Sequence, residues 1–276
     1  MKNFTQAPLP FQGQKRRFLT DFKVALQDFK STPLFVDLFG GSGLLSHTVK
    51  QMYPDAEVIY NDFDDYHIRI NNIDRTNVLL TDIRRIVAGS ADDKIISKDI
   101  KDIIISRIEM EEKTGFVDYI TLSASLLFSM KYVMNLDELK KQTFYNCVKK
   151  NDYDRADDYL NEVTIVKQDY RVLFERWKHI TGVVFLVDPP YLSTDVSTYT
   201  NYWRLANYLD VLTVLKGTSY FYFTSNKSSI LEFCEWVETN LSADNPFNGA
   251  IKKEMSVSLN HNSGYTDIML YKKIKK

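Results

Sequence analysis

The 276-residue sequence predicts an α/β protein with a doubly wound, mostly parallel sheet. Three observations favour this class. Apolar, strand-like runs alternate with helix-like stretches, a long central interval has helical spacing and no proline, and the last segment holds two strand-like runs around a turn signal. Together they predict a parallel core, an inserted helical subdomain and an antiparallel carboxyl-terminal edge.

The core strands are predicted by five runs that are rich in β-branched and aromatic residues. They are residues 34–39, 57–62, 163–169, 183–188 and 219–226. The sequence also predicts helices that begin near Lys15, Leu44, Tyr66, Trp203 and Ser228, several of them after a Ser, Thr or Asp cap. Strands that are joined through helices lie parallel, so we expect helices on both faces of the sheet.

The interval from Asp82 to about Asn161 departs from this alternation. It has no proline, and apolar residues recur at helical spacing in 99–112 and 119–134. We therefore expect a helical subdomain that is inserted into the main domain. The expected bounds are 83–161 for the insertion and 1–82 with 162–276 for the main domain.

The last segment, residues 254–273, closes the predicted sheet. Its two strand-like runs flank Asn262, Ser263 and Gly264, which are typical of a tight turn. We expect these runs to add antiparallel strands at the edge of the sheet.

Composition narrows the function classes. The 35 Lys and Arg residues nearly balance the 36 Asp and Glu residues, so the net charge of −1 gives no signal for binding a polyanion along the whole chain. No apolar run reaches about 18 residues, which argues against a membrane span. Cys147 and Cys234 lack metal-ligand spacing. We expect a cytoplasmic protein with two free thiols and no metal.

The segment VDLFGGSG, residues 36–43, puts an acid and a glycine-rich turn directly after the first predicted strand. Glycines let a ligand approach the backbone, and the next helix offers oriented N–H groups at its start. Asp62 ends the second run, about 20 residues on, where an acid of a βαβ unit meets ribose hydroxyls. The pair predicts a nucleoside site, although each part alone also fits an ordinary turn and a solvated acid.

The segment FLVDPPYL, residues 185–192, ends a strand-like run in an acid, two prolines and a tyrosine. Pro189 and Pro190 fix the backbone and cannot donate hydrogen bonds, so they stop the strand and stiffen a turn. That turn displays Asp188 and Tyr191. An acceptor beside an aromatic ring favours a binding site, and the alternative is a strand-ending turn with a half-buried tyrosine.

These motifs resemble the S-adenosylmethionine-dependent DNA adenine N6-methyltransferases of the alpha type, in which the loop that binds the methyl donor precedes a DPPY motif. VDLFGGSG is similar to that loop, VDPPY at 187–191 to the catalytic turn, and PFQGQK at 10–15 to an amino-terminal F/W-x-G-x-K element. The resemblance implies a Rossmann-like methyltransferase sheet. It also implies S-adenosylmethionine as donor, no metal, and double-stranded DNA as partner.

The resemblance also assigns residues and partners. It implies that the inserted subdomain recognises the target, that the enzyme is a monomer, and that a companion restriction endonuclease belongs to the expected partners. The catalytic residues would be Asp188, Pro189, Pro190 and Tyr191. The donor would be bound by Phe11, Lys15, Asp37, Phe39, Gly40, Gly41, Ser42, Gly43, Asp62 and Asp169.

The chemistry of an adenine amino group explains why the turn at residues 188–191 carries an acid and a tyrosine. Its lone pair is delocalised into the ring, so acceptors for its two N–H groups are needed to direct the lone pair at a methyl group. The Asp188 carboxylate and the Pro189 carbonyl could be these acceptors, and Tyr191 could stack on a base that has left the duplex.

Two other functions remain open at this point. One is methyl transfer to RNA adenine or to a protein glutamine, and the other is a catalytically silent nucleic-acid-binding relative. The target sequence does not carry over, because LSASLLFSMKY in the insertion lacks the aromatic and Asn-Gly pattern of the better-known relatives. Phe11 and Lys15 also fit an apolar anchor and a lysine at a helix start.

Overall fold

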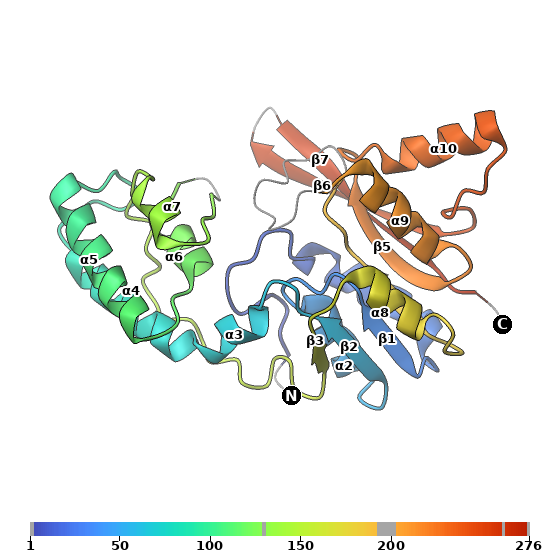
Figure 1. The fold of residues 1–276 in the computed structure, drawn as a ribbon, viewed down its shortest axis with the longest axis horizontal. Coiled ribbons are helices and arrows are strands. Elements are labelled where there is room, and N and C mark those ends of the chain that lie inside the picture. The colour runs from blue at the N-terminus through green and yellow to red at the C-terminus, as the bar shows by residue number, and fades with distance from the viewer. Residues whose placement is uncertain (1–2, 129–130, 192–202, 261–262, 275–276) are drawn as a thin grey trace. The chain divides into compact units, whose positions relative to one another are not determined.

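The computed structural model describes residues 3–128, 131–191, 203–260 and 263–274 (Figure 1). The chain divides into two compact units, a sheet unit and a helical unit. The sheet unit comprises Met1–Thr5, Lys15–Asp64 and Leu160–Lys276, and the helical unit comprises Gln6–Gln14 and Asp65–Tyr159.

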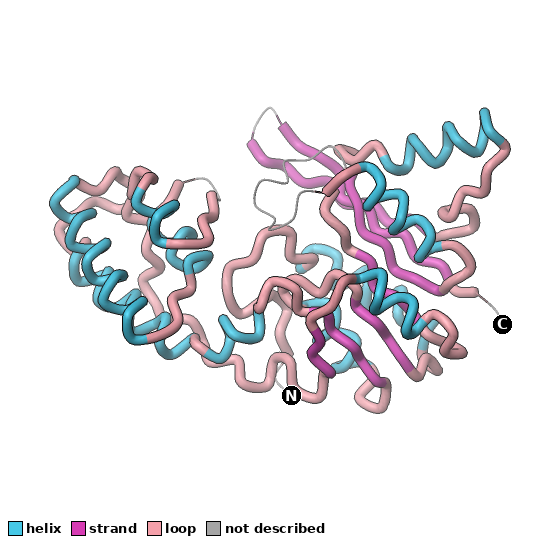
Figure 2. Tube along the Cα trace, in the orientation of Figure 1, coloured by secondary structure: helices cyan, strands magenta, loops and turns pink. Residues whose placement is uncertain are grey.

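The sheet unit contains a seven-stranded sheet in the order β3-β2-β1-β4-β5-β7-β6 (Figure 2). The strands are β1 (Leu34–Asp37), β2 (Glu57–Asn61), β3 (Thr164–Val166), β4 (Val184–Val187), β5 (Ser219–Ser225), β6 (Ile251–Asn260) and β7 (Ser263–Lys272). The first five pair in parallel, whereas β7 pairs antiparallel with β5 and β6 antiparallel with β7. The predicted fold class is therefore confirmed. Part of the predicted turn at Asn262 lies outside the described residues.

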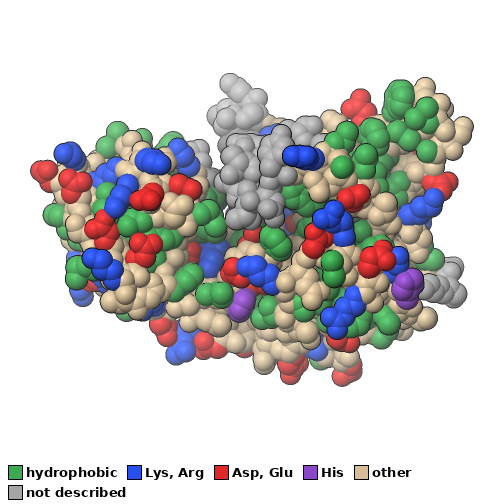
Figure 3. Space-filling view, viewed as in Figure 1, with side chains coloured by type: hydrophobic (Ala, Val, Ile, Leu, Met, Phe, Trp, Pro, Cys, Tyr) green, Lys and Arg blue, Asp and Glu red, His purple; other side chains and the backbone are tan. Residues whose placement is uncertain are grey.

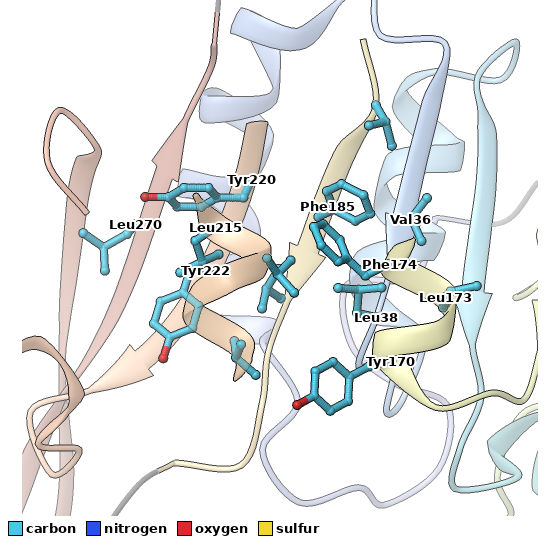
Figure 4. Close-up of a cluster of buried hydrophobic side chains, with 14 of the residues drawn as sticks. Val36, Leu38, Tyr170, Leu173, Phe174, Phe185, Leu215, Tyr220, Tyr222 and Leu270 are labelled. Carbon is cyan, nitrogen blue, oxygen red and sulfur yellow. The ribbon is translucent and has the colours of Figure 1, made fainter. Parts of the chain in front are cut away.

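Helices cover both faces of this sheet. One face packs against α8 (Tyr170–Trp177), α9 (Leu205–Leu215) and α10 (Ile230–Leu241), and the other against α1 (Leu19–Leu26) and α2 (Leu44–Met52). Figure 4 shows the first of these cores, in which strand side chains meet helix side chains, among them Val36, Leu38, Phe185, Tyr220, Tyr222, Leu173, Phe174 and Leu215. β1 and β4 are buried along their whole length, as their continuous apolar runs predict.

The helices largely begin where the sequence predicts. α2 and α3 (Tyr66–Asn71) start at the expected residues, and α9 and α10 start two residues later than expected. The helix expected near Lys15 begins with a short 3₁₀ turn at Arg16–Phe18. The sequence did not predict α8, because the run 163–169 predicts a strand that ends at Asp169, the residue that caps this helix.

The helical unit is built from α3, α4 (Ile73–Ile86), α5 (Lys98–Thr114), α6 (Tyr119–Leu126) and α7 (Leu136–Lys140). Its core contains Leu79, Leu80 and Ile83 of α4. The unit spans Asp65–Tyr159 and also includes Gln6–Gln14, whereas the expected insertion was 83–161. One expectation was wrong: α6 ends at Leu126 and does not continue to residue 134, because the backbone is extended at Leu127.

Candidate functional site

The carboxyl ends of three parallel strands bring the sequence motifs to one edge of the sheet. The Leu38 N–H donates to the Leu186 carbonyl at 3.0 Å, which ties the end of β1 to β4. The Gly40 N–H donates to the Asn61 carbonyl at 3.3 Å, which ties the loop after β1 to the end of β2. We call residues 37–43 the glycine loop and residues 188–191 the DPPY turn. Both lie at this edge, as ligand sites of such sheets do.

The glycine loop needs its glycines for two separate reasons. Gly41 and Gly43 have φ values of 50° and 70°, which lie in the left-handed region that glycine adopts without strain. At Gly40 the limit is space, because a Cβ there would lie 2.1 Å from the Tyr60 ring and 2.9 Å from the Asn61 carbonyl. The loop closes with a bond from the Gly43 N–H to the Gly40 carbonyl at 2.8 Å, and α2 starts at the next residue. Ser42 in this loop is buried.

Asp37, the acid of the glycine loop, is buried, with 1% of its surface exposed. Its Oδ2 accepts a hydrogen bond from the Ser46 hydroxyl at 2.7 Å, whereas Oδ1 has no partner among the described residues. Burial raises the pKa of Asp37 to about 7. The Ser46 hydrogen bond opposes the rise, and repulsion from Asp188 adds to it. A ligand that donates to Oδ1 would relieve this unfavourable environment.

Lys15 makes an ion pair with Asp188. Its Nζ lies 2.6 Å from Oδ2, and the two side chains are only 8% and 17% exposed. Burial raises the pKa of Asp188, while the charge and hydrogen bond of Lys15 oppose that rise. The same Nζ lies 5.4 Å from the centroid of the Tyr191 ring. Lys15 therefore contacts the DPPY turn itself, a contact that its sequence position alone does not indicate.

The rest of the DPPY turn is fixed by its surroundings. Pro189 is buried and Pro190 is half-buried. The Tyr191 carbonyl accepts a hydrogen bond from the Tyr208 hydroxyl of α9 at 3.4 Å. The two prolines fix φ and remove two backbone donors, so Asp188 and Tyr191 stand on a stiff turn.

Asn61 was not among the predicted site residues. It is 2% exposed, and its side-chain amide donates to the carbonyls of Leu38 at 3.0 Å and Gln168 at 2.9 Å. Its Oδ1 accepts from the Gln168 N–H at 3.0 Å. Asn61 therefore clamps the ends of β1 and β3 across β2, and a polar residue at a buried strand end was the available signal. Asp62 follows it and is 1% exposed.

Two of the predicted donor-binding residues, Phe39 after β1 and Asp169 after β3, contact neighbouring side chains or backbone of the sheet unit. Asp169 caps α8: its Oδ1 accepts from the Arg171 N–H at 2.8 Å, and Arg171 lowers its pKa. Phe39 packs against Tyr170, with ring centroids 4.9 Å apart, and against Trp203 at 5.7 Å. The sequence did not predict this aromatic cluster. Donor binding by Asp169 and Phe39 stays a prediction.

Phe11 belongs to the helical unit. Its ring meets the Tyr66 ring edge-on, with centroids 5.6 Å apart. Its contribution to donor binding also stays a prediction.

Elsewhere in the described part of the chain, no group of side chains adds to this candidate site. His, Cys, Asp and Glu side chains there form no group suited to a metal ion, and Cys147 and Cys234 are free thiols. None of the described helices is long and apolar enough to span a bilayer. A hollow of about 490 Å³ near Lys216, Asp244 and Lys272 contains none of the predicted site residues.

Comparisons with known proteins agree with the motifs at this edge. Residues 11–218 match the family described as "D12 class N6 adenine-specific DNA methyltransferase". A curated protein of Haemophilus influenzae strain Rd, named "Putative methyltransferase", is 36% identical over 280 residues, which cover 98% of this chain and 93% of that protein. The resemblance seen in the glycine loop and the DPPY turn is thereby confirmed.

Proposed function

Because the chain belongs to the D12 class N6 adenine-specific DNA methyltransferases, we propose that it methylates a flipped adenine of double-stranded DNA by direct in-line displacement. Family membership makes it an adenine-specific DNA methyltransferase that uses S-adenosylmethionine and DNA. The flipped base and the direct displacement are the proposed part. The observation that supports them most is the Lys15–Asp188 ion pair beside Asp37 and Tyr191.

The residues of the glycine loop fit the methyl donor. The unpartnered Oδ1 of buried Asp37 suits a cationic donor such as the ammonium of S-adenosylmethionine. Gly40, Gly41 and Gly43 leave this stretch of backbone without side chains, so a ligand can approach it closely. Asp62, at the end of β2, is the acid for the ribose hydroxyls. S-adenosylmethionine supplies a methyl group that its sulfonium already activates, so the proposal includes no metal.

Asp188 and Pro189 direct the adenine amino group. The Asp188 carboxylate accepts one of the two N–H groups and the Pro189 carbonyl accepts the other, which localises the nitrogen lone pair. Lys15 keeps Asp188 ionised, since its charge opposes the rise in pKa that burial causes. An ammonium group 2.6 Å from Oδ2 also holds the carboxylate in place before substrate binds. The acceptor is therefore preorganised.

Tyr191 supplies a stacking surface. Its ring lies next to the acceptor on the same turn, half-buried, with the Lys15 cation 5.4 Å from its centroid. Stacking of a base on an aromatic ring contributes about 1–3 kcal/mol. Extrusion of a base costs a few kcal/mol, so this contact offsets a large part of the cost.

The inserted subdomain, residues 83–161, is the proposed target-recognition region. On the face in Figure 3, basic and acidic side chains are interspersed over the helical unit. Charged side chains of this unit form ion pairs with one another: Arg107 contacts Asp82 at 2.9 Å and Glu111 at 2.7 Å. Attraction to phosphates must then come from other residues or from opened pairs. Replacing 83–161 by the equivalent segment of a relative that has another target, but keeps an acid at the position of Asp118, should change the methylated sequence and leave donor affinity unchanged.

The test of the proposal is methyl transfer from labelled S-adenosylmethionine to unmethylated double-stranded DNA, followed by nucleoside analysis. The expected product is N6-methyladenine. Label on cytosine would contradict the substrate, and label only on RNA or on a glutamine-containing peptide would support the alternatives. Donor binding without any transfer would indicate a silent relative. A cytoplasmic monomer with a companion restriction endonuclease completes the proposal, and light scattering of the purified protein tests the monomer.

A further inference from the structure

The segment that carries Phe11 is held to α3 through its backbone. The Tyr66 hydroxyl accepts from the Leu9 N–H at 3.0 Å and donates to the Leu9 carbonyl at 3.1 Å. Tyr66 has no exposed surface, and its ring is the one that Phe11 meets edge-on. One side chain of α3 therefore fixes both the backbone before Phe11 and the Phe11 ring.

Arg69, one turn further along α3, extends this contact. Its Nη2 donates to the Pro10 carbonyl at 2.8 Å, and its Nε lies 3.0 Å from both oxygens of Asp118. The guanidinium carbon lies 5.0 Å from the centroid of the Tyr66 ring. A planar guanidinium can serve a carbonyl and a carboxylate in two fixed directions at once, and a lysine ammonium cannot reproduce that geometry.

Asp118 connects the Arg69 guanidinium to α6. It is 3% exposed and caps the helix by accepting from the Thr121 N–H at 3.0 Å, and it also accepts from the Thr121 hydroxyl at 2.7 Å. Arg69 thus links the residue before Phe11 to the amino terminus of a helix in the inserted subdomain.

The burial of Arg69 favours a role in geometry. The residue is 4% exposed, and its Nη1 has no hydrogen-bond partner among the described residues. Apolar side chains of similar volume often stabilise a fold as well as a buried ion pair does. Stability alone therefore explains this arginine poorly, whereas a requirement to hold Pro10 and Asp118 in a fixed geometry explains it directly.

We infer that Arg69 is a positioning residue for the methyl donor: it fixes the Pro10 carbonyl, and through it the backbone that presents Phe11, and ties this segment to the start of α6. The inference rests on the proposed donor-binding role of Phe11. It also implies that a change at the α6 cap alters donor affinity, although neither Arg69 nor Asp118 is expected to touch the donor.

The test uses Arg69→Lys in the full-length protein, with Arg75→Lys as the matched control. Arg75 belongs to α4 of the same unit, and its Nη2 lies 2.6 Å from Glu111. Its Nε also donates to a backbone carbonyl, that of Phe116, at 3.1 Å. Calorimetry should show S-adenosylmethionine binding weakened about tenfold by Arg69→Lys, the loss expected for one hydrogen bond to a charged group. Arg75→Lys should lower the melting temperature without changing donor affinity.

Two further measurements separate positioning from a general loss of structure. The KM for the donor should rise in Arg69→Lys, while the single-turnover rate at saturating donor stays unchanged. In a Phe11→Ala background, Arg69→Lys should add no further loss of affinity, because the residue through which it acts is gone.

The outcomes are distinguishable. Equal donor affinity in Arg69→Lys and wild type, or a full additional loss in the Phe11→Ala background, would overturn the inference. Wild-type protein that does not bind S-adenosylmethionine would overturn the proposed function itself. If Arg69→Lys does not fold, Tyr66→Phe keeps the ring and removes both contacts to Leu9, and it should weaken donor binding in the same direction. Unchanged affinity in that variant would also contradict the inference.

Discussion

Lys15→Met removes one charge from the DPPY turn and keeps most of the buried volume. Lys15 and Asp188 lie 2.6 Å apart, and neither side chain is more than 17% exposed. For two unit charges at this distance, an effective dielectric constant of about 20 gives an attraction of about 6 kcal/mol. Desolvation of both groups offsets most of it, but removal of one partner leaves a buried, unpaired charge, which costs about 3–5 kcal/mol.

The variant has one way to avoid this cost, which is to protonate Asp188. Burial already raises the pKa of Asp188, and Lys15 opposes that rise, so the pKa must rise further in Lys15→Met. The adenine amino group needs the carboxylate as acceptor, so methyl transfer should fall at neutral pH and recover in part as the pH increases. The stability difference from wild type should narrow as the pH falls, because protonation removes the unpaired charge.

The assay is the single-turnover rate of methyl transfer at saturating donor and DNA, measured across pH for both proteins. In the plot of rate against pH, the low-pH side, here called the acid limb, should move to higher pH in the variant. Lys50→Met is the matched control: Lys50 is also 8% exposed, but its Nζ donates to the carbonyls of Pro54 and Ala56, and it makes no ion pair with a carboxylate of the described residues. It should lower stability and leave the acid limb in place. An unchanged acid limb in Lys15→Met would refute the role of this ion pair in keeping Asp188 ionised.

Three further predictions concern the same edge of the sheet. Asp188→Asn should slow single-turnover transfer by about 10²–10³ with donor affinity near normal, since it removes one preorganised acceptor; near-normal transfer would exclude Asp188 as that acceptor. Asp37→Asn should weaken donor binding by calorimetry and yet stabilise the donor-free protein at pH 8. Its pKa is raised to about 7 from 3.8, so the ionised form destabilises the fold as pH rises through that interval, by at most about 4 kcal/mol. Thermal melts should show a larger gain at pH 8 than at pH 5, where only part of the penalty has developed, and an equal gain at both would contradict the assignment. Gly40→Ala should abolish donor binding, because its Cβ would overlap the Tyr60 ring, whereas Gly89→Ala, with open space around it, should bind normally.

The sheet was predictable because its signals are local. β4 is apolar at each residue, and β1 is apolar up to its last residue, Asp37. Short buried runs of this kind, bounded by turn signals, are typical of strands in a parallel sheet. β3 is short and partly exposed, so its sequence signal is weak: the run 163–169 predicts a strand through Asp169, whereas β3 ends at Val166 and Asp169 caps α8. An acid followed by YRVLFERW, with apolar residues at helical spacing, was the signal that could have corrected this.

The sequence indicates residues that the structure brings to one edge of the sheet, but not how they contact one another; their roles in binding and catalysis stay predictions. Lys15 was expected to bind the donor and Asp188 to orient the adenine amino group, yet nothing in their sequence positions indicates that they pair. The pair depends on how η1, the 3₁₀ turn Arg16–Phe18, packs against the end of the sheet, through Phe18 and Phe223. Asn61 shows the same limit, because its three contacts come from the parallel order of β1, β2 and β3.

The helical unit consists of two separate segments of the chain, and this limits which chimaeras of related enzymes should fold. Segment Gln6–Gln14 belongs to that unit, and its backbone is bonded to Tyr66 and Arg69. A graft of residues 83–161 exchanges Asp118 but retains Arg69, so a compatible parent must carry an acid at the same place. A parent without one would leave a buried guanidinium unpaired at the crossover. Recombination between relatives is therefore expected to be tolerated where this arginine and its acid are inherited together.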